Sequence, residues 1–124
     1  MAKNESSENY LEAILMLSKK LPVVRSVDIA NELGFKKSSV SVAMKNLREK
    51  EHIKVDEQGF IHLTPSGLEI ANMIYERHTL LSSWLIHLGV PADVAAADAC
   101  KMEHVISTES FEAIKRHVYE NKEV

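Results

Sequence analysis

Two short amphipathic segments joined at a glycine constrain the fold of this chain more than any other feature. In SVDIANELG, the side chains of Val27, Ala30 and Leu33 share one helical face, and Gly34 ends the pattern. After the link FKK, the stretch SSVSVAMKNLREKEH repeats a helical period, and the alternating runs IKV and FIHL then flank the turn DEQG. Two helices with a tight glycine connection and a following hairpin predict a winged helix-turn-helix.

The second helix of this pair has an apolar inner face and a polar, basic outer face. We expect Ser38 to cap it and Val40, Ala43, Met44 and Leu47 to point inward. Residues 36–54 carry a net charge of +4, which leaves −7 for the rest of the chain. A basic helix in this position fits the major groove of DNA, although the same charges on a small α+β domain could simply face water. The residues expected to face DNA are Lys36, Lys37, Ser38, Ser39, Ser41, Val42, Lys45 and Arg48.

Helical patterns flank this module on both sides. A first helix is expected after the cap candidates Ser6 and Ser7 and ends near Lys20. Thr64 is expected to cap a long helix whose first residue is Pro65. The stretches PADVAAADACKMEHVI and STESFEAIKRHVYENK predict two more helices, the last capped by Ser107. The predicted fold is mainly α with a small β-hairpin: a winged helix-turn-helix DNA-binding domain at 1–63 and a helical metal-binding and dimerisation domain at 64–124.

The stretch ACKMEHVIS contains the clearest candidate for chemistry. Cys100, Glu103 and His104 are spaced i, i+3 and i+4, so on a helix they share one face. Thiolate, carboxylate and imidazole are the usual protein ligands of divalent transition metals. By pattern alone, a buried cysteine beside a surface Glu–His pair explains the same residues. His78, on the apolar side of the long helix, and Glu12, near the apolar stripe of the first helix, become candidates only if they converge on the same place.

Several functional classes have no support in this sequence. It contains no HExxH motif, no glycine-rich phosphate loop and no recognisable Ser-His-Asp arrangement, so an enzyme is not expected. A lone cysteine forms no internal disulfide. No apolar run approaches the roughly 20 residues of a membrane span, and MAKNESSENY lacks the apolar region of a signal peptide. We therefore expect a cytoplasmic protein with no membrane partner.

Five ordered segments resemble the diphtheria toxin repressor family, which comprises metal-activated repressors and includes the manganese transport regulators. They are ENYLEAILML, VRSVDIANELGFKKSSVSVAMKNL, LTPSGLEIA, ERHTLL and DACKMEHVIS. The resemblance implies a homodimeric repressor of metal-ion homeostasis in which a divalent ion ties the first helix to the dimerisation helices. It implies the metal ligands Glu12, His78, Glu103 and His104, with Cys100 where iron-type members have cysteine and manganese-type members have glutamate. Asn9 stands where the former have methionine and the latter aspartate.

These residues lead us to expect Fe²⁺ as the activating ion and Mn²⁺ as the next candidate. A thiolate favours softer, later metals than manganese, and affinity alone would also let Zn²⁺ or Co²⁺ bind in vitro. The expected partner is a palindromic double-stranded DNA operator, because a two-fold dimer presents two recognition helices about 34 Å apart. The alternative is a metal-independent winged-helix regulator in which Cys100 is a redox sensor; a zinc hydrolase is a further rival.

Overall fold

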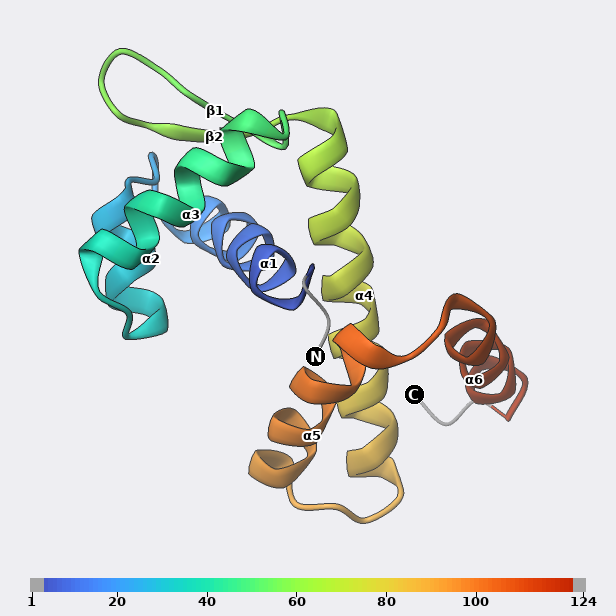
Figure 1. Ribbon diagram of the computed structural model, residues 1–124. Helices are drawn as coiled ribbons and strands as arrows, with labels where there is room; N and C mark the ends of the chain where they lie inside the picture. Colours follow the sequence, from blue (N-terminus) through green and yellow to red (C-terminus); the bar gives the residue numbers. More distant parts are fainter. Residues whose placement is uncertain (1–3, 122–124) are drawn as a thin grey trace. The chain divides into compact units, whose positions relative to one another are not determined.

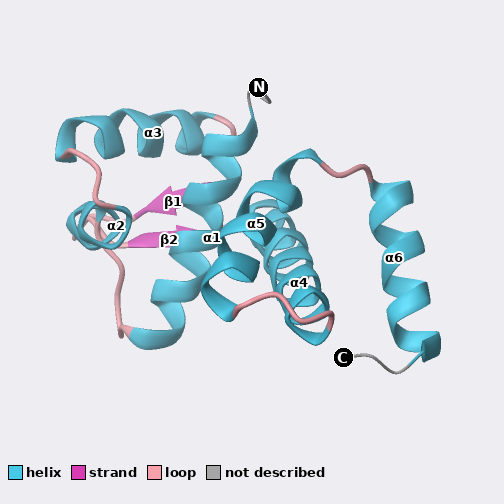
Figure 2. Ribbon diagram, turned by 90° about the horizontal axis from the view of Figure 1, so that it is seen from below, coloured by secondary structure: helices cyan, strands magenta, loops and turns pink. Residues whose placement is uncertain are grey.

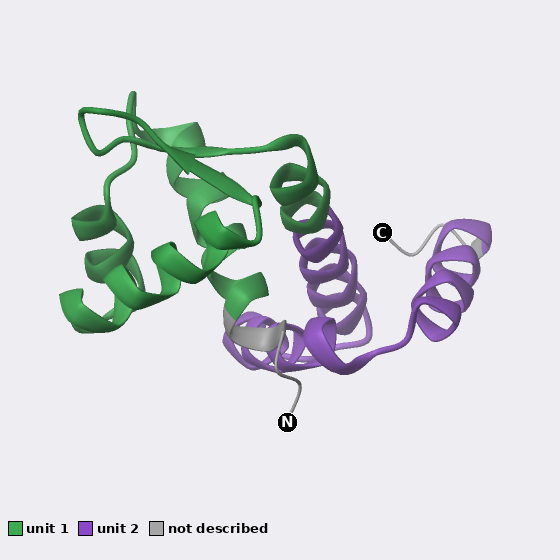
Figure 3. Ribbon diagram, turned by 45° about the horizontal axis from the view of Figure 1, so that its top comes forward, with its two compact units in different colours: residues 1, 3–72 green, residues 2, 73–124 purple. Residues whose placement is uncertain are grey.

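The computed structural model describes residues 4–121, which form six helices and one two-stranded sheet (Figures 1 and 2). The chain divides into two compact units (Figure 3), which we call the N-terminal unit, residues 4–72, and the C-terminal unit, residues 73–121. The elements in order are α1 Asn4–Lys20, α2 Ser26–Leu33, α3 Lys37–Glu49, β1 Ile53–Val55, β2 Ile61–Leu63, α4 Pro65–His87, α5 Ala92–Val105 and α6 Thr108–Asn121. The predicted mainly helical fold, with its helix-turn-helix and hairpin, is confirmed.

The turn between α2 and α3 depends on Gly34. This residue has a φ of 70°, a left-handed conformation that glycine adopts without strain, and its N–H donates to the Ala30 carbonyl over 2.9 Å. The turn lets the inner faces of the two helices meet, with Ile29 on α2 and Val40 and Leu47 on α3 all buried. The expectation that Val27 lies on the inner face is wrong: it is exposed, and Ile29 takes that place.

Three predicted serine caps are also corrected. Ser6 and Ser7 lie within α1, which begins at Asn4 in the described part of the chain, and Ser38 lies inside the first turn of α3. At α2 the cap is Arg25, whose backbone N–H donates to the Asp28 carboxylate over 2.8 Å. Side-chain acceptors are common near helix starts, so the pattern alone does not decide which of several candidates acts as the cap.

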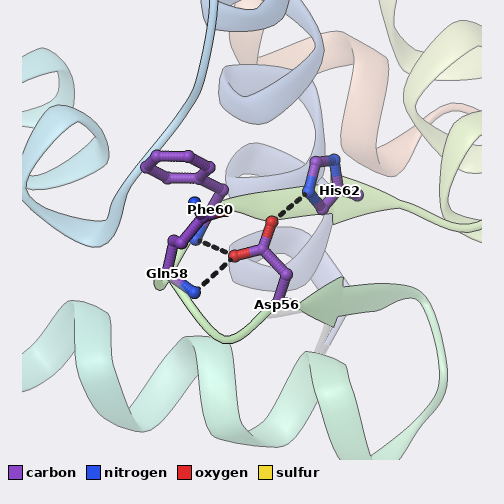
Figure 4. A network of polar contacts seen from close by, with 4 residues as sticks. All are labelled: Asp56, Gln58, Phe60 and His62. Carbon is purple, nitrogen blue, oxygen red and sulfur yellow. Dashed lines mark hydrogen bonds and ion pairs between the residues drawn. The ribbon is translucent and has the colours of Figure 1, made fainter.

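The hairpin turn is organised by one carboxylate (Figure 4). Strands β1 and β2 are antiparallel, with Val55 opposite Ile61. The Asp56 carboxylate accepts the backbone N–H groups of Gln58 and Phe60 over 2.9 and 3.0 Å, and its second oxygen lies 3.0 Å from His62 Nε2. This turn, residues 56–60, is the wing of the winged helix-turn-helix, and it is acidic and internally hydrogen-bonded.

The long helix α4 begins in the N-terminal unit with a predicted cap that is confirmed. Thr64 Oγ1 accepts the Gly67 N–H over 3.2 Å and donates to the Glu51 carbonyl over 2.7 Å. A side-chain carbon at Gly67 would overlap the backbone carbonyl oxygen of His52, so a glycine is required where α4 passes this loop. The two compact units meet within α4, between Asn72 and Met73; the functional division between residues 63 and 64 stays a prediction.

The C-terminal unit packs its three helical segments around a small apolar cluster. α5 and α6 lie on different sides of α4 (Figures 1 and 2), and Leu81, Ala99, Phe111 and Val118 are among the buried residues that join them. The predicted cap of α6 is confirmed, since the Ser110 N–H donates to Ser107 Oγ over 3.0 Å. None of the described helices is long and apolar enough to cross a membrane.

Candidate functional site

The cysteine, glutamate and histidine of α5 come together as their spacing predicts. One potential ligand atom from each of Cys100, Glu103 and His104 lies within 4.8 Å of the others. Cys100 is exposed, whereas Glu103 is fully buried and the His104 side chain is 1% exposed. This burial is the reverse of the alternative explanation, which requires a buried cysteine beside a surface Glu–His pair.

The buried Glu103 carboxylate faces an imidazole on each of its two oxygens. His78 Nδ1, from α4, lies 2.8 Å from Oε1, and His104 Nε2 lies 3.5 Å from Oε2. An isolated carboxylate is costly to bury unless polar or charged partners compensate for lost water. The His78–Glu103 hydrogen bond supplies part of that compensation and brings a residue from a second helix, α4, to the cluster.

This donor set fits a divalent transition metal. Sulfur, carboxylate oxygen and imidazole nitrogen are the atoms that such ions bind. The carboxylate and the His104 ring are shielded from water, and Cys100 gives the cluster an exposed side. A cluster with this chemistry can hold an ion.

Two further predicted ligands belong to the N-terminal unit. Asn9 and Glu12 both lie on α1 and are half-buried. Because α1 is one regular helix, the two side chains point from the same face, three positions apart. Their part in a metal site stays a prediction.

The residues predicted to face DNA form an exposed surface at the start and along the outer side of α3. The same helix buries Val40 and Leu47 on its other side, so its two faces divide as predicted. Val42 is 61% exposed among polar neighbours. None of the four predicted cations forms an ion pair with another residue in the described part of the chain. The exposed positions are Lys36, Lys37, Ser38, Ser39, Ser41, Val42, Lys45 and Arg48.

Sequence reasoning missed one buried residue beside the cluster. Arg77 precedes His78 on α4, and its side chain bonds to the end of α5. Its position offered a weak signal, because it lies three residues after Ile74 and four before Leu81, in the apolar stripe of α4. A charged residue in an apolar stripe is expected to have hydrogen-bond partners in the interior, as Arg77 does.

Comparison with known proteins identifies the family. Residues 4–63 match the family described as iron dependent repressor, N-terminal DNA binding domain, and residues 64–123 match iron dependent repressor, metal binding and dimerisation domain. The transcriptional regulator MntR of Salmonella typhimurium is 32% identical over 111 residues, which cover 90% of this chain and 71% of that protein. The chain belongs to the diphtheria toxin repressor family. The resemblance read from its five sequence segments is thereby confirmed.

Solved structures of family members agree with this assignment. The manganese regulator SloR matches with a TM-score of 0.81 and 28% identity, covering 96% of this chain and 55% of that one. A manganese-dependent transcriptional repressor in complex with manganese has a TM-score of 0.81, 26% identity and coverages of 90% and 51%. The chain thus spans about half the length of these two proteins. The diphtheria toxin repressor family consists of metal-dependent transcriptional regulators rather than enzymes, as the absence of catalytic motifs led us to expect.

Proposed function

We propose that this chain is a metal-dependent repressor of metal-ion homeostasis that binds a palindromic DNA operator as a homodimer. The observation that carries the proposal is the fully buried Glu103 carboxylate between two imidazoles. It lies in the part of the chain that matches a metal-binding and dimerisation domain. In the part that matches a DNA-binding domain, the outer face of α3 carries cations that form no ion pair with any other described residue.

The proposed metal ligands come from both units. His78, Cys100, Glu103 and His104 would be contributed by α4 and α5, and Glu12 by α1, with Asn9 beside it at a position whose contribution is open to test. The positive charge of a bound divalent ion would compensate the buried Glu103 carboxylate. Its binding free energy would stabilise any arrangement in which these ligands converge. Through that differential affinity, metal would favour the arrangement that fits two DNA half-sites.

We propose Fe²⁺ as the physiological ion, with Mn²⁺ as the next candidate. The support is chemical: Cys100 offers a thiolate, and the neutral Asn9 withholds a charge that a hard ion would favour. The relatives reported above carry manganese names, which makes Mn²⁺ the necessary comparison. Zn²⁺ or Co²⁺ would bind more tightly than iron in vitro, so availability in the cell would supply the selectivity.

The proposed DNA surface is the exposed face of α3, from Lys36 to Arg48. Lysine and arginine there would contact phosphates, and the side chains near the helix start would approach base edges. A two-fold dimer formed through the C-terminal unit would place the two copies of α3 about 34 Å apart. Sedimentation at micromolar concentration, with and without metal, is expected to give a dimer, and a monomer under both conditions would refute this assembly.

The test is a parallel metal titration monitored by DNA binding. The probe is a duplex selected from a random pool by the Co²⁺-loaded protein, and the ions are Fe²⁺ (under anaerobic conditions), Mn²⁺, Co²⁺ and Zn²⁺. We expect activation by metal and its reversal by a chelator. DNA affinity that a chelator leaves unchanged would favour the metal-independent regulator with Cys100 as a redox sensor.

A pair of Cys100 variants makes the same titration specific for the ion. Cys100→Glu should shift the response toward Mn²⁺, because it replaces a soft ligand by a hard one. Cys100→Ala is the matched control, which removes the thiolate without adding a carboxylate. If wild-type protein responds fully to micromolar Mn²⁺ and Cys100→Ala responds equally well, the iron assignment is wrong while the metal-dependent function stands.

A further inference from the structure

A buried arginine lies directly beside the proposed metal ligands. Arg77 is 7% exposed and immediately precedes His78 on α4. Together with Glu103 it makes up the buried charged residues in the described part of the chain. A guanidinium keeps its charge at every accessible pH, so its burial has to be compensated by hydrogen bonds rather than by loss of a proton.

The partners of Arg77 are the end of α5 and the start of α6. Nη1 donates to the Glu103 carbonyl over 3.1 Å and to the Ile106 carbonyl over 2.9 Å, and Nη2 lies 3.5 Å from Thr108 Oγ1. The guanidinium carbon lies 5.4 Å from the centre of the Phe111 ring, within the range of a cation–π contact. One side chain from α4 thus engages α5, the link and α6.

These contacts have a clear physical basis. The last carbonyls of a helix lack partners within the helix and carry partial negative charge, so a cation is favourable there. The planar guanidinium presents several N–H groups in a fixed fork, and here one nitrogen serves two carbonyls. Its Nε is buried without a hydrogen-bond partner among residues 4–121. The orientation of the side chain therefore satisfies the contacts with α5 and α6 and leaves Nε unpaired.

The contacts of consecutive α4 residues converge on Glu103. Arg77 holds its backbone carbonyl, and His78 bonds its carboxylate over 2.8 Å. The main chain and side chain of one proposed ligand are therefore fixed from the same helix, and the adjacent His104 shares that stretch of backbone. A metal ligand held in this way has fewer conformations to lose when an ion binds.

We infer that Arg77 is a positioning residue for the metal site: it fixes the end of α5 and the start of α6 so that Glu103 and His104 stand ready for the ion. The inference rests on the proposed metal-dependent function and deepens it. Arg77 itself is no ligand, because a guanidinium has no lone pair to offer to a cation. The same contacts would link occupancy of the site to the placement of α6.

The test compares Co²⁺ binding by the full-length wild type, Arg77→Lys and Arg77→Met. Absorption spectra report both affinity and the geometry of the bound ion. We expect Arg77→Met to bind about 10- to 100-fold more weakly, the usual effect of losing a group that orients a ligand, and to show shifted cobalt bands. Arg77→Lys should fall between, because an ammonium keeps the charge and loses the fork.

Lys115→Met is the matched control. Lys115 also links α6 to α4, through a 2.7 Å contact between its Nζ and Glu76 Oε2, but within residues 4–121 it contacts none of the proposed ligands. Its loss should leave Co²⁺ affinity within twofold. If Arg77→Met does not fold, Thr108→Val, which removes one of the three hydrogen-bond partners, should still weaken Co²⁺ binding and increase hydrogen exchange at residues 105–110 in metal-free protein.

The outcomes separate two failures. Wild-type protein that binds no Co²⁺ would refute the metal site and, with it, this role of Arg77. Wild-type protein that binds Co²⁺, together with Arg77→Met or Thr108→Val proteins of unchanged affinity and spectrum, would refute the positioning role and leave the metal site intact.

Discussion

The two units of the molecule differ in what they bury. In the N-terminal unit the fully buried side chains are apolar, with Leu11, Ile29 and Leu47 among the largest, and the cations of α3 are exposed. The C-terminal unit buries Arg77 and Glu103 beside its apolar cluster. A buried ion pair or network is weak evidence for stability, because apolar residues of similar volume often stabilise a core as well or better.

This difference suggests that the buried residues of the two units have different roles: those of the N-terminal unit stabilise the fold, and those of the C-terminal unit include the proposed metal ligand Glu103. The N-terminal unit has the composition of a scaffold that holds one polar helix face toward a partner. The C-terminal unit keeps two charged side chains in its interior, where each needs compensating contacts, and one of them, the Glu103 carboxylate, is a group that binds metal ions. Substitutions in the C-terminal unit should therefore impair metal binding, whereas substitutions in the core of the N-terminal unit should lower stability.

The largest expected effect concerns the buried carboxylate. Glu103→Ala should abolish activation by every metal while the protein stays folded, and Glu103→Gln should do the same with almost unchanged side-chain shape. The metal-free Glu103→Gln protein should be at least as stable as wild type, since a buried charge is removed. Isothermal titration with Mn²⁺ and Co²⁺, alongside thermal unfolding in chelator, checks both statements. Retained metal binding in both variants would contradict the site.

A substitution at a tightly packed position of the N-terminal unit should instead lower the free energy of unfolding. Gly67→Ala places a methyl group against the backbone carbonyl of His52 and should cost about 1–3 kcal/mol of unfolding free energy. Asn72→Ala is the control: it is an exposed position on the same helix, where alanine should be neutral or slightly stabilising. Urea unfolding of the two variants in chelator measures the difference. Equal stabilities would mean that the loop at His52 yields at little cost.

Removing one cation from α3 should affect DNA binding without affecting either core. Lys45→Ala and Arg48→Ala should each weaken binding roughly equally across DNA sequences and reduce the slope of log affinity against log salt by about one. Metal affinity should be unchanged, which distinguishes these variants from those at Glu103. Salt titrations with two unrelated duplexes provide the measurement, and an unchanged slope in both variants would mean that this face of α3 does not meet phosphates.

The smallest expected effect is in the wing. The His62 hydrogen bond, with the N–H groups of Phe60 and Gln58, lowers the pKa of the Asp56 carboxyl. A carboxyl whose folded-state pKa is lowered contributes stability above the ordinary aspartate pKa of about 3.9, and that contribution is lost as the pH falls through the folded-state value. Asp56→Asn should therefore weaken the turn at neutral pH, and protonation of Asp56 at low pH should have the same effect in wild type. Amide hydrogen exchange at Gln58 and Phe60 reports it, and identical protection in the variant would exclude this role.

Most of the fold could be predicted because its signals are local. Gly34 marks the turn, the hydrophobic period assigns the inner face of α3, and Thr64 and Ser107 cap the helices they precede. The cap at α2 could not be chosen from the pattern, since the capping residue is Arg25, whose backbone N–H donates to the Asp28 carboxylate. Such local competition is decided by backbone geometry rather than by residue type.

The candidate site was predictable only in part, for a different reason. The spacing of Cys100, Glu103 and His104 along one helix places them together whatever surrounds them. The burial of Glu103, and the role of Arg77, depend on the packing of α4, α5 and α6, which residue spacing does not encode. A charged residue in the apolar stripe of a long helix is the signal to look for in other chains.

The proposed metal site around Glu103 is tested by locating the bound ion in a crystal structure. Crystals of the full chain grown with stoichiometric Co²⁺ should give an anomalous scattering peak at the cobalt absorption edge. We expect a peak bonded to the Glu103 carboxylate, with His78, Cys100 or His104 among the other ligands of the ion. Cobalt bound only elsewhere, such as at the exposed His87 or His117, would contradict it.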